Sequence, residues 1–197
     1  MFNQMRKRIY RQKARADQTQ NTRQLIIEAT VKLHEELGPA KTTIKAIAEQ
    51  AGVQRLTVYR HFPDDTSLFQ ACSSQWFGIH PPPAVEGMAE DAVTLAHNTL
   101  LAFYRYYRKT EGMWQSLYRD INEVEAMRGP MNQFEAYLDR VRDELLVAWK
   151  DKNRDPKYLS LTLRHCLRFS TWRALKTEKL SDKKMVDLVM NWINQWN

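Results

Sequence analysis

The sequence has little of what disulfide-rich, exported or membrane-spanning proteins need. Its 197 residues include two cysteines, Cys72 and Cys166, which are too few for a disulfide framework and lie outside the Cys/His spacing of a structural zinc site. Its longest apolar runs are a few residues, far short of the roughly 20 that cross a bilayer, and no apolar segment follows the basic N-terminus as in an export signal. We therefore expect a cytoplasmic protein without a membrane segment.

Motifs of catalysis are absent from the sequence as well. It has no Gly-rich phosphate loop, no His-Glu-x-x-His metal motif and no nucleophile elbow. His165 and Cys166 are neighbours, but adjacent residues of a helix point about 100° apart and do not face each other for proton transfer. The carboxylates of Asp120, Glu123 and Glu125 fit a solvated turn. We expect no enzyme, no cofactor and no metal site.

The positive charge of the chain lies entirely in its first third. Residues 1–63 contain twelve Lys/Arg and five Asp/Glu, whereas residues 64–197 contain eighteen of each, so the net charge of +7 belongs to the first segment. Six of these cations precede the first acidic residue, Asp17, and residues 1–21 are predicted to form a flexible basic arm. Such asymmetry is typical of a segment that binds a polyanion, although a solvated basic surface is the alternative.

Helical periodicity dominates the sequence, and no alternating stretch indicates a strand. Thr22 is the expected N-cap of a first helix, which ends at Gly38-Pro39. Thr42 or Thr43 caps a second helix that stops at Gly52, and a helix of two turns follows with Val58 and Phe62 facing inward. A helix, a tight turn and a short helix form a helix-turn-helix, so residues 22–63 are predicted to be a DNA-binding domain.

The rest of the chain is predicted to be a connecting helix at 64–79 and a C-terminal helical domain at 80–197. The fold class is therefore all-α with about nine helices. The last two predicted helices, about 156–177 and 181–196, are apolar on more than one side, so we expect them to pair with a second copy in a homodimer. The alternative is that they are interior helices of a single bundle.

A segment of about 47 residues, from Arg23 to Phe69, resembles the DNA-binding domain of TetR-family transcriptional regulators. The matching residues are Arg23, Ile26, Ile27, Ala29, Leu33, Gly38, Thr42, Thr43, Ile44, Ile47, Ala48, Ala51, Gly52, Val53, Thr57, Tyr59, His61, Phe62, Leu68 and Phe69. The resemblance implies an all-helical homodimer with a helix-turn-helix in each copy and a ligand-responsive C-terminal domain.

The same resemblance implies which residues contact a double-stranded DNA operator. Phosphate contacts are implied for Thr43, Tyr59 and His61, and contacts in the groove for Gln54, Arg55, Leu56 and Thr57. Hydroxyls and helix N-termini suit phosphates, and Arg and Gln suit base edges. The basic arm is expected to follow the DNA backbone or to lie in the minor groove, although it could also contribute little.

Four residues depart from the family pattern. Gln54 stands where a small hydroxyl residue usually caps the recognition helix, and Leu56 stands where the family has Gly. Asp65 replaces a phosphate-contacting Lys, so that contact is not transferred. His34 replaces an aromatic residue of the first helix and is expected to be a partly buried core imidazole.

The neutral C-terminal region is rich in aromatic residues, which suit a small-molecule pocket. The candidate pocket residues are Phe103, Tyr107, Trp114, Tyr118, Phe134, Tyr137 and Trp149, for which ordinary core packing is the alternative. The predicted function is a dimeric repressor released from its operator by a hydrophobic or aromatic effector. The alternatives are an effector-independent DNA-binding dimer and an activator that acts with a protein partner.

Overall fold

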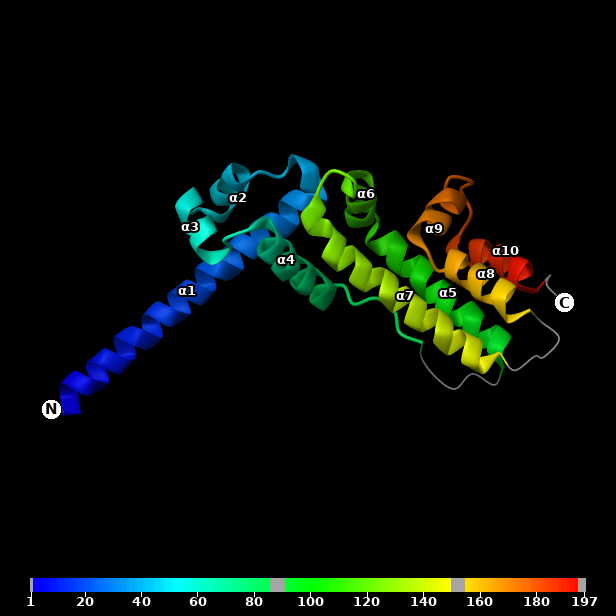
Figure 1. Ribbon diagram of the computed structural model, residues 1–197, viewed down its shortest axis with the longest axis horizontal. Helices are drawn as coiled ribbons and strands as arrows, with labels where there is room; N and C mark the ends of the chain where they lie inside the picture. The colour runs from blue at the N-terminus through cyan, green and yellow to red at the C-terminus, as the bar shows by residue number, and fades with distance from the viewer. Residues whose placement is uncertain (1, 86–90, 150–154, 195–197) are drawn as a thin grey trace. The chain divides into compact units, whose positions relative to one another are not determined.

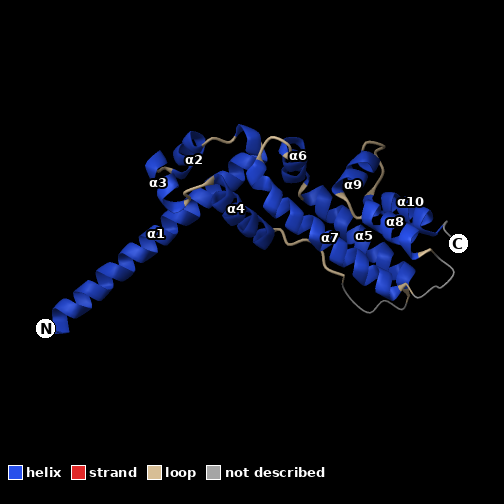
Figure 2. Ribbon diagram, in the orientation of Figure 1, coloured by secondary structure: helices blue, strands red, loops and turns tan. Residues whose placement is uncertain are grey.

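The computed structural model describes residues 2–85, 91–149 and 155–194, with side chains from residue 10, and this part of the chain is helical without strands (Figure 2). The α-helices are α1 (Phe2–Glu36), α2 (Ile44–Ala51), α3 (Arg55–His61), α4 (Asp65–Ile79), α5 (Ala92–Lys109), α6 (Glu111–Asp120), α7 (Arg128–Ala148), α8 (Pro156–Cys166), α9 (Phe169–Lys176) and α10 (Asp182–Asn194). Two 3₁₀ helices, η1 (Pro39–Lys41) and η2 (Glu125–Met127), lie between them. The predicted all-α fold class is confirmed.

The chain divides into two compact units. The N-terminal unit contains Met1–Ile79 and Ser116–Arg128, and the C-terminal unit contains His80–Gln115 and Gly129–Asn197. The predicted linear division at 80–197 therefore differs from the structure, because the end of α6 and the following turn belong to the N-terminal unit. No helix among the described residues combines the length and the apolar content that a bilayer span requires.

The N-terminal unit is a small helical domain built on one apolar core. Helices α2, α3 and α4 gather around the C-terminal half of α1, and the N-terminal half of α1 continues beyond them (Figure 1). The buried core consists of Ile26, Ile27, Leu33, Ile47, Ala48, Val58, Phe62, Leu68 and Cys72. These residues recur at helical spacing in the sequence, which is why the amphipathic faces of all four helices meet in one core.

The predicted start of the first helix at Thr22 is wrong. Helix α1 is continuous from Phe2 to Glu36, so residues 2–21 are helical and do not form an irregular arm. The Thr22 hydroxyl does not cap a helix terminus; it donates a hydrogen bond to the Gln18 carbonyl one turn back, at 2.9 Å. The first glycine and the first proline of the chain are Gly38 and Pro39, so nothing earlier interrupts the helix.

The C-terminal unit is a bundle of α5, α7, α8, α9 and α10, with the start of α6. Helix α5 begins after Asp91, whose carboxylate caps the helix by accepting a hydrogen bond from the Thr94 backbone N–H at 2.8 Å.

The single helix predicted for residues 156–177 is wrong, because it is broken into α8 and α9. The Tyr104 hydroxyl donates to the Cys166 carbonyl at 3.1 Å, and the Tyr107 hydroxyl donates to the Leu167 carbonyl at 2.8 Å. The Thr171 hydroxyl likewise donates to the His165 carbonyl at 2.6 Å. Side-chain donors thus satisfy carbonyls that a continuing helix would have used, so the chain can turn there without losing hydrogen bonds.

Candidate nucleic-acid interface

The turn between α2 and α3 fixes the orientation of the short helix α3. The Thr43 hydroxyl caps α2 by accepting a hydrogen bond from the Ala46 backbone N–H at 3.1 Å. Gly52 ends α2 in the left-handed conformation with φ 67°, and the Val53 N–H donates to the Ala48 carbonyl at 2.9 Å. Because residues other than glycine rarely adopt this conformation, Gly52 permits the sharp turn.

Helix α3 is anchored by one apolar face and exposes the opposite one. Val58 is fully buried and Phe62 is 3% exposed, and the Arg23 guanidinium of α1 lies 4.8 Å from the centre of the Phe62 ring. On the outer face, Leu56 is 68% exposed and Tyr59 is 52% exposed. Both side chains are therefore available for contact with another molecule.

The other predicted DNA-binding residues lie on or beside this face. Gln54 and Arg55 are exposed, whereas Thr57 and His61 are half-buried. Gln54 is the N-cap residue of α3 but makes no side-chain capping bond, as expected from the missing hydroxyl residue, so its amide extends into solvent. The exposed face therefore offers an amide, a guanidinium and a phenol, which are hydrogen-bonding groups suited to DNA.

A polar hollow of about 440 Å³ lies between α1 and α3, and we call it the α1–α3 hollow. It is lined by Arg15, Gln18, Thr19, Thr22, Thr57, Arg60 and His61. Two guanidinium groups and several donors line it, and no carboxylate does. A phosphate group fits this chemistry, because charged and neutral donors together bind anionic oxygens.

Sequence reasoning missed the contribution of Gln18, Thr19 and Thr22 to this surface. They were assigned to a flexible arm and its boundary, whereas the continuous helix α1 places them beside residues of α3 in the lining of one hollow. The sequence feature that indicates a continuous helix is the absence of glycine and proline before Gly38.

The predicted aromatic pocket residues do not all meet in one place. Phe103, Tyr107 and Trp114 are fully buried, Phe134 is 3% exposed and Tyr137 is half-buried in the C-terminal unit. We call these five residues the aromatic cluster.

The rings of the aromatic cluster pack directly on one another. The Trp114 and Phe134 ring centres are 4.3 Å apart, and those of Tyr107 and Trp114 are 6.0 Å apart. The Tyr137 hydroxyl donates to the Pro83 carbonyl at 2.6 Å. The cluster is therefore a well-packed core, in which edge-to-face and offset contacts are favourable.

The two remaining predicted pocket residues lie elsewhere. Tyr118 belongs to the N-terminal unit, and Trp149 is half-buried after the end of α7. A hollow of about 290 Å³ in the C-terminal unit is lined by Pro83, Ala84, Asn98, Thr99 and Ala102 rather than by aromatic rings.

Comparison with known proteins adds three findings to this geometry. Residues 26–72 match the family model described as bacterial regulatory proteins, tetR family. The chain is 38% identical over 77 residues to the HTH-type transcriptional regulator TtgR of Pseudomonas putida, a match that covers 39% of this chain and 37% of that protein. The chain thus matches little more than a third of the length of this curated relative.

Two solved structures share the fold over most of their length. A TetR-like transcriptional regulator from Rhodococcus sp. RHA1 is 18% identical with a TM-score of 0.61, covering 86% of this chain and 91% of that one. RolR in complex with the ligand resorcinol is 19% identical with a TM-score of 0.54, covering 91% of this chain and 90% of that one. At these identities the likeness concerns the fold.

Proposed function

Because the chain belongs to the TetR family of bacterial regulatory proteins, we propose that it is a dimeric DNA-binding repressor released from its operator by a small-molecule effector. The observation that supports DNA binding best is the divided surface of α3. Its inner face is fixed by the buried side chains of Val58 and Phe62, and its outer face exposes hydrogen-bonding groups and one large apolar side chain. A short, rigidly held helix with such an outer face fits a major groove.

In this proposal the outer face of α3 supplies the contacts to the bases. The donors of Gln54 and Arg55 suit the acceptors on purine edges, and the exposed Leu56 side chain suits a thymine methyl group. Thr43, Tyr59 and His61 hold the flanking phosphates, and these contacts fix the register of α3 in the groove.

The test begins with selection of genomic fragments bound by the protein, which supplies an operator. Arg55→Ala and Tyr59→Ala are each expected to weaken operator binding by about 1–3 kcal/mol without changing the oligomeric state. The matched control is Lys32→Ala, which removes an exposed cation of α1 that pairs with Glu36. Unchanged operator affinity in both α3 variants would refute the proposed docking.

The extended helix α1 is proposed to hold one further stretch of DNA backbone. Arg15 lines the α1–α3 hollow, and Arg11 lies one turn before it on the same face, since residues four apart on a helix are neighbours. Lys13 lies two residues from Arg15 and therefore on nearly the opposite face. The helix thus separates cations that face the proposed DNA from one that does not.

This separation gives a matched pair of variants for a salt titration. Arg11→Gln/Arg15→Gln is expected to reduce the slope of log K against log salt by about 1–2, because each lost phosphate contact removes about one released counterion. Lys13→Gln carries the control, and its slope is expected to match the unmodified protein. Equal slopes for all three proteins would show that Arg11 and Arg15 contribute no backbone contact.

The proposed homodimer forms through α8 and α10. Leu161 of α8 is 54% exposed and Leu188 of α10 is 36% exposed, and the two helices pack on each other. Apolar side chains left in water on two adjacent helices favour a two-fold partner surface. Leu161→Glu/Leu188→Glu is expected to give a monomer in analytical ultracentrifugation, whereas Val147→Glu, at a 79% exposed position of α7, retains the dimer. A dimer that persists in the double variant contradicts this interface.

The proposed effector site lies in the C-terminal unit, near the aromatic cluster. A fold that accommodates resorcinol in RolR supports an aromatic ligand, and the packed rings of Trp114 and Phe134 must separate to admit one. The test is thermal melting against a panel of hydrophobic and aromatic compounds, followed by release from the operator. A compound that stabilises the protein and releases DNA supports the effector; a panel without either effect favours the effector-independent regulator.

A further inference from the structure

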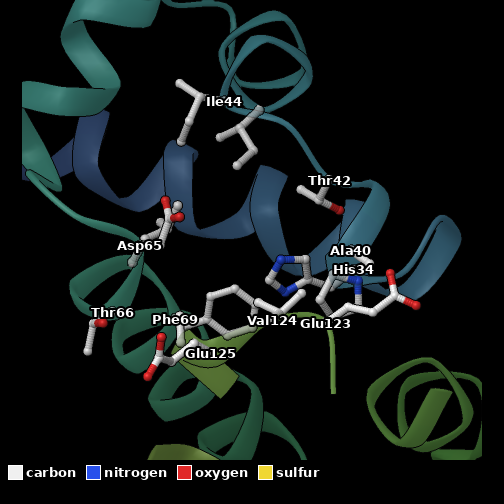
Figure 3. Close-up of a pocket in the computed structure, with 14 residues that line it drawn as sticks. His34, Ala40, Thr42, Ile44, Asp65, Thr66, Phe69, Glu123, Val124 and Glu125 are labelled. Atoms are coloured by element: carbon white, nitrogen blue, oxygen red, sulfur yellow. The ribbon is translucent and has the colours of Figure 1, made fainter. Parts of the chain in front are cut away.

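A second hollow, of about 510 Å³, lies wholly within the N-terminal unit. It is bordered by the end of α1, the start of α2, the start of α4 and the turn of residues 123–126 after α6 (Figure 3). We call it the His34 hollow. Its volume falls within the range of about 300–1,000 Å³ that small-molecule sites occupy.

The floor of the His34 hollow consists of two stacked rings. The His34 imidazole and the Phe69 ring have centres 4.7 Å apart and planes inclined by 26°, and they are 4% and 8% exposed. Among the described residues no side chain or carbonyl bonds to the imidazole, and its nitrogens are not among the fully buried unpartnered atoms, so they open onto the hollow. A ligand in the hollow can therefore form a hydrogen bond with the ring in place of water.

Burial keeps the His34 ring neutral. It lowers the pKa of His34 from 6.5 to about 4, while the charge of Asp120 opposes the shift. At neutral pH the ring therefore has one nitrogen that donates a hydrogen bond and one that accepts. The accepting nitrogen suits an N–H group of a bound molecule.

Carboxylates surround this floor. Figure 3 shows Asp65, Glu123 and Glu125 around the paired rings of His34 and Phe69. All three acidic residues are exposed, and no lysine or arginine is among the residues that line the hollow. Glu125 has an exposed cation, Arg128, at 3.6 Å outside the hollow, an arrangement that contributes little in water. The lining is therefore negative above an aromatic floor.

We propose that the His34 hollow binds a small, flat aromatic cation with N–H donors, such as an aromatic amidinium or a protonated aromatic amine. The flat ring packs against Phe69 and the apolar side chain of Val124, one N–H donates to the free nitrogen of His34, and the positive charge lies among the three carboxylates. An anion of the same shape is repelled, and a neutral analogue loses the electrostatic part of the affinity.

The site is distinct from the proposed effector site, and its binding does not depend on the proposed function. Its link to DNA does depend on it, because Thr42, Ile44 and Ile47 also line the hollow and position α2. A ligand that prefers one placement of α2 changes operator affinity by the difference in its binding free energy between the two placements.

Calorimetric titration of the full chain with 2-naphthamidine, in the absence of DNA, tests the binding site. The neutral 2-naphthamide has the same ring and nearly the same shape, and we expect it to bind at least about tenfold more weakly, equivalent to about 1.4 kcal/mol. Glu123→Gln/Glu125→Gln is expected to weaken amidine binding about tenfold and to leave amide binding unchanged. The control pair, Glu36→Gln/Glu49→Gln, removes two exposed carboxylates that do not line the hollow and is expected to bind as the unmodified protein does.

His34→Phe retains the stacked ring, removes the accepting nitrogen and is expected to weaken the amidine about tenfold. If this variant does not fold, as judged by its helical circular dichroism, the carboxylate pair still decides the question. Failure of 2-naphthamidine to bind, equal binding of the amide, or equal losses in the two glutamate pairs would each overturn the proposal. Loss of operator binding by Arg55→Ala concerns the proposed function alone, since the titration contains no DNA.

Discussion

Protonation of His34 is expected to destabilise the protein as the pH falls from 6.5 to 4. The ring is buried between α1 and α4, and burial lowers its pKa from 6.5 to about 4. In the unfolded chain the imidazole is protonated as the pH falls through its ordinary pKa. In the folded protein it is protonated only when the pH approaches the lowered pKa. Between these values the unfolded state binds more protons, so stability decreases as the pH decreases.

The size of the effect follows from the two pKa values. Each pKa unit corresponds to about 1.4 kcal/mol, so the full penalty below pH 4 is about 3 kcal/mol. At pH 5 the unfolded imidazole is almost fully protonated and the folded one almost fully neutral, and the loss is about 2 kcal/mol. Above pH 7 the titration of His34 contributes nothing. Asp120 raises the pKa of His34, and the acidic groups that line the hollow are Asp65, Glu123 and Glu125.

Urea unfolding at pH 7 and pH 5 measures this effect. His34→Phe keeps an aromatic ring against Phe69 but cannot take up a proton, so its loss between the two pH values should be about 2 kcal/mol smaller than that of the unmodified protein. His61→Gln, at a half-buried position of the proposed DNA surface, serves as a control for the loss of a histidine. If His34→Phe and the unmodified protein lose the same stability, the imidazole is not held neutral by burial and the reasoning fails.

Three further substitutions test the local structure of the N-terminal unit. Gly38→Ala should lower the free energy of unfolding by about 1–3 kcal/mol, because Gly38 has φ 89° and a Cβ there would lie 2.5 Å from Asp120 Oδ2; an unchanged urea midpoint would contradict this. Thr43→Ala should cost about 1 kcal/mol in the same assay, because it removes the acceptor of the Ala46 N–H, and Thr43→Ser should restore most of it. Asp120→Asn should destabilise the protein at pH 7 and progressively less as the pH falls. The hydrogen bond from Arg119 lowers the pKa of Asp120, and the stability that the carboxylate contributes is lost once it is protonated. A difference in stability between the two proteins that does not vary between pH 7 and pH 3 would argue against this role of Asp120.

The helix-turn-helix could be predicted from the sequence because its determinants are local. A cap at Thr43, a left-handed glycine at Gly52 and an apolar pair at Val58 and Phe62 each act within one or two turns of the chain. The same holds for α4, whose start is set by Asp64 accepting the Ser67 N–H at 2.7 Å. At these positions the local sequence preference and the tertiary packing favour the same structure, so the prediction from sequence holds.

The sequence predictions of helix boundaries were wrong where a residue has two possible local roles, or where a hydrogen-bond donor distant in the sequence determines the end of a helix. A threonine hydroxyl caps a helix N-terminus or bonds the carbonyl one turn back, and Thr22 does the latter. The break after Cys166 contains neither glycine nor proline, so the local sequence gives no sign of it. The carbonyls at the break accept hydrogen bonds from tyrosine hydroxyls of α5, some 60 residues earlier in the chain. The imidazole of His34 was predicted to be partly buried, and the residue is 4% exposed. The carboxylates near it come from α4 and from the turn after α6, which no spacing in the sequence places together.

The two hollows of the N-terminal unit are connected through the helix-turn-helix itself. Ile44 and Ile47 of α2 border the His34 hollow, whereas Thr57 of α3 borders the α1–α3 hollow. Three residues, 52–54, separate α2 from α3, and Val58 of α3 lies in the same buried core as Ile47 of α2, so we expect a displacement of α2 to act on α3. Interfaces of this kind shift between discrete packings rather than deform continuously. We therefore expect an occupant of the His34 hollow that moves α2 to move the α3 side chains proposed to hold DNA phosphates as well, and an occupant that fits the present packing to stabilise them.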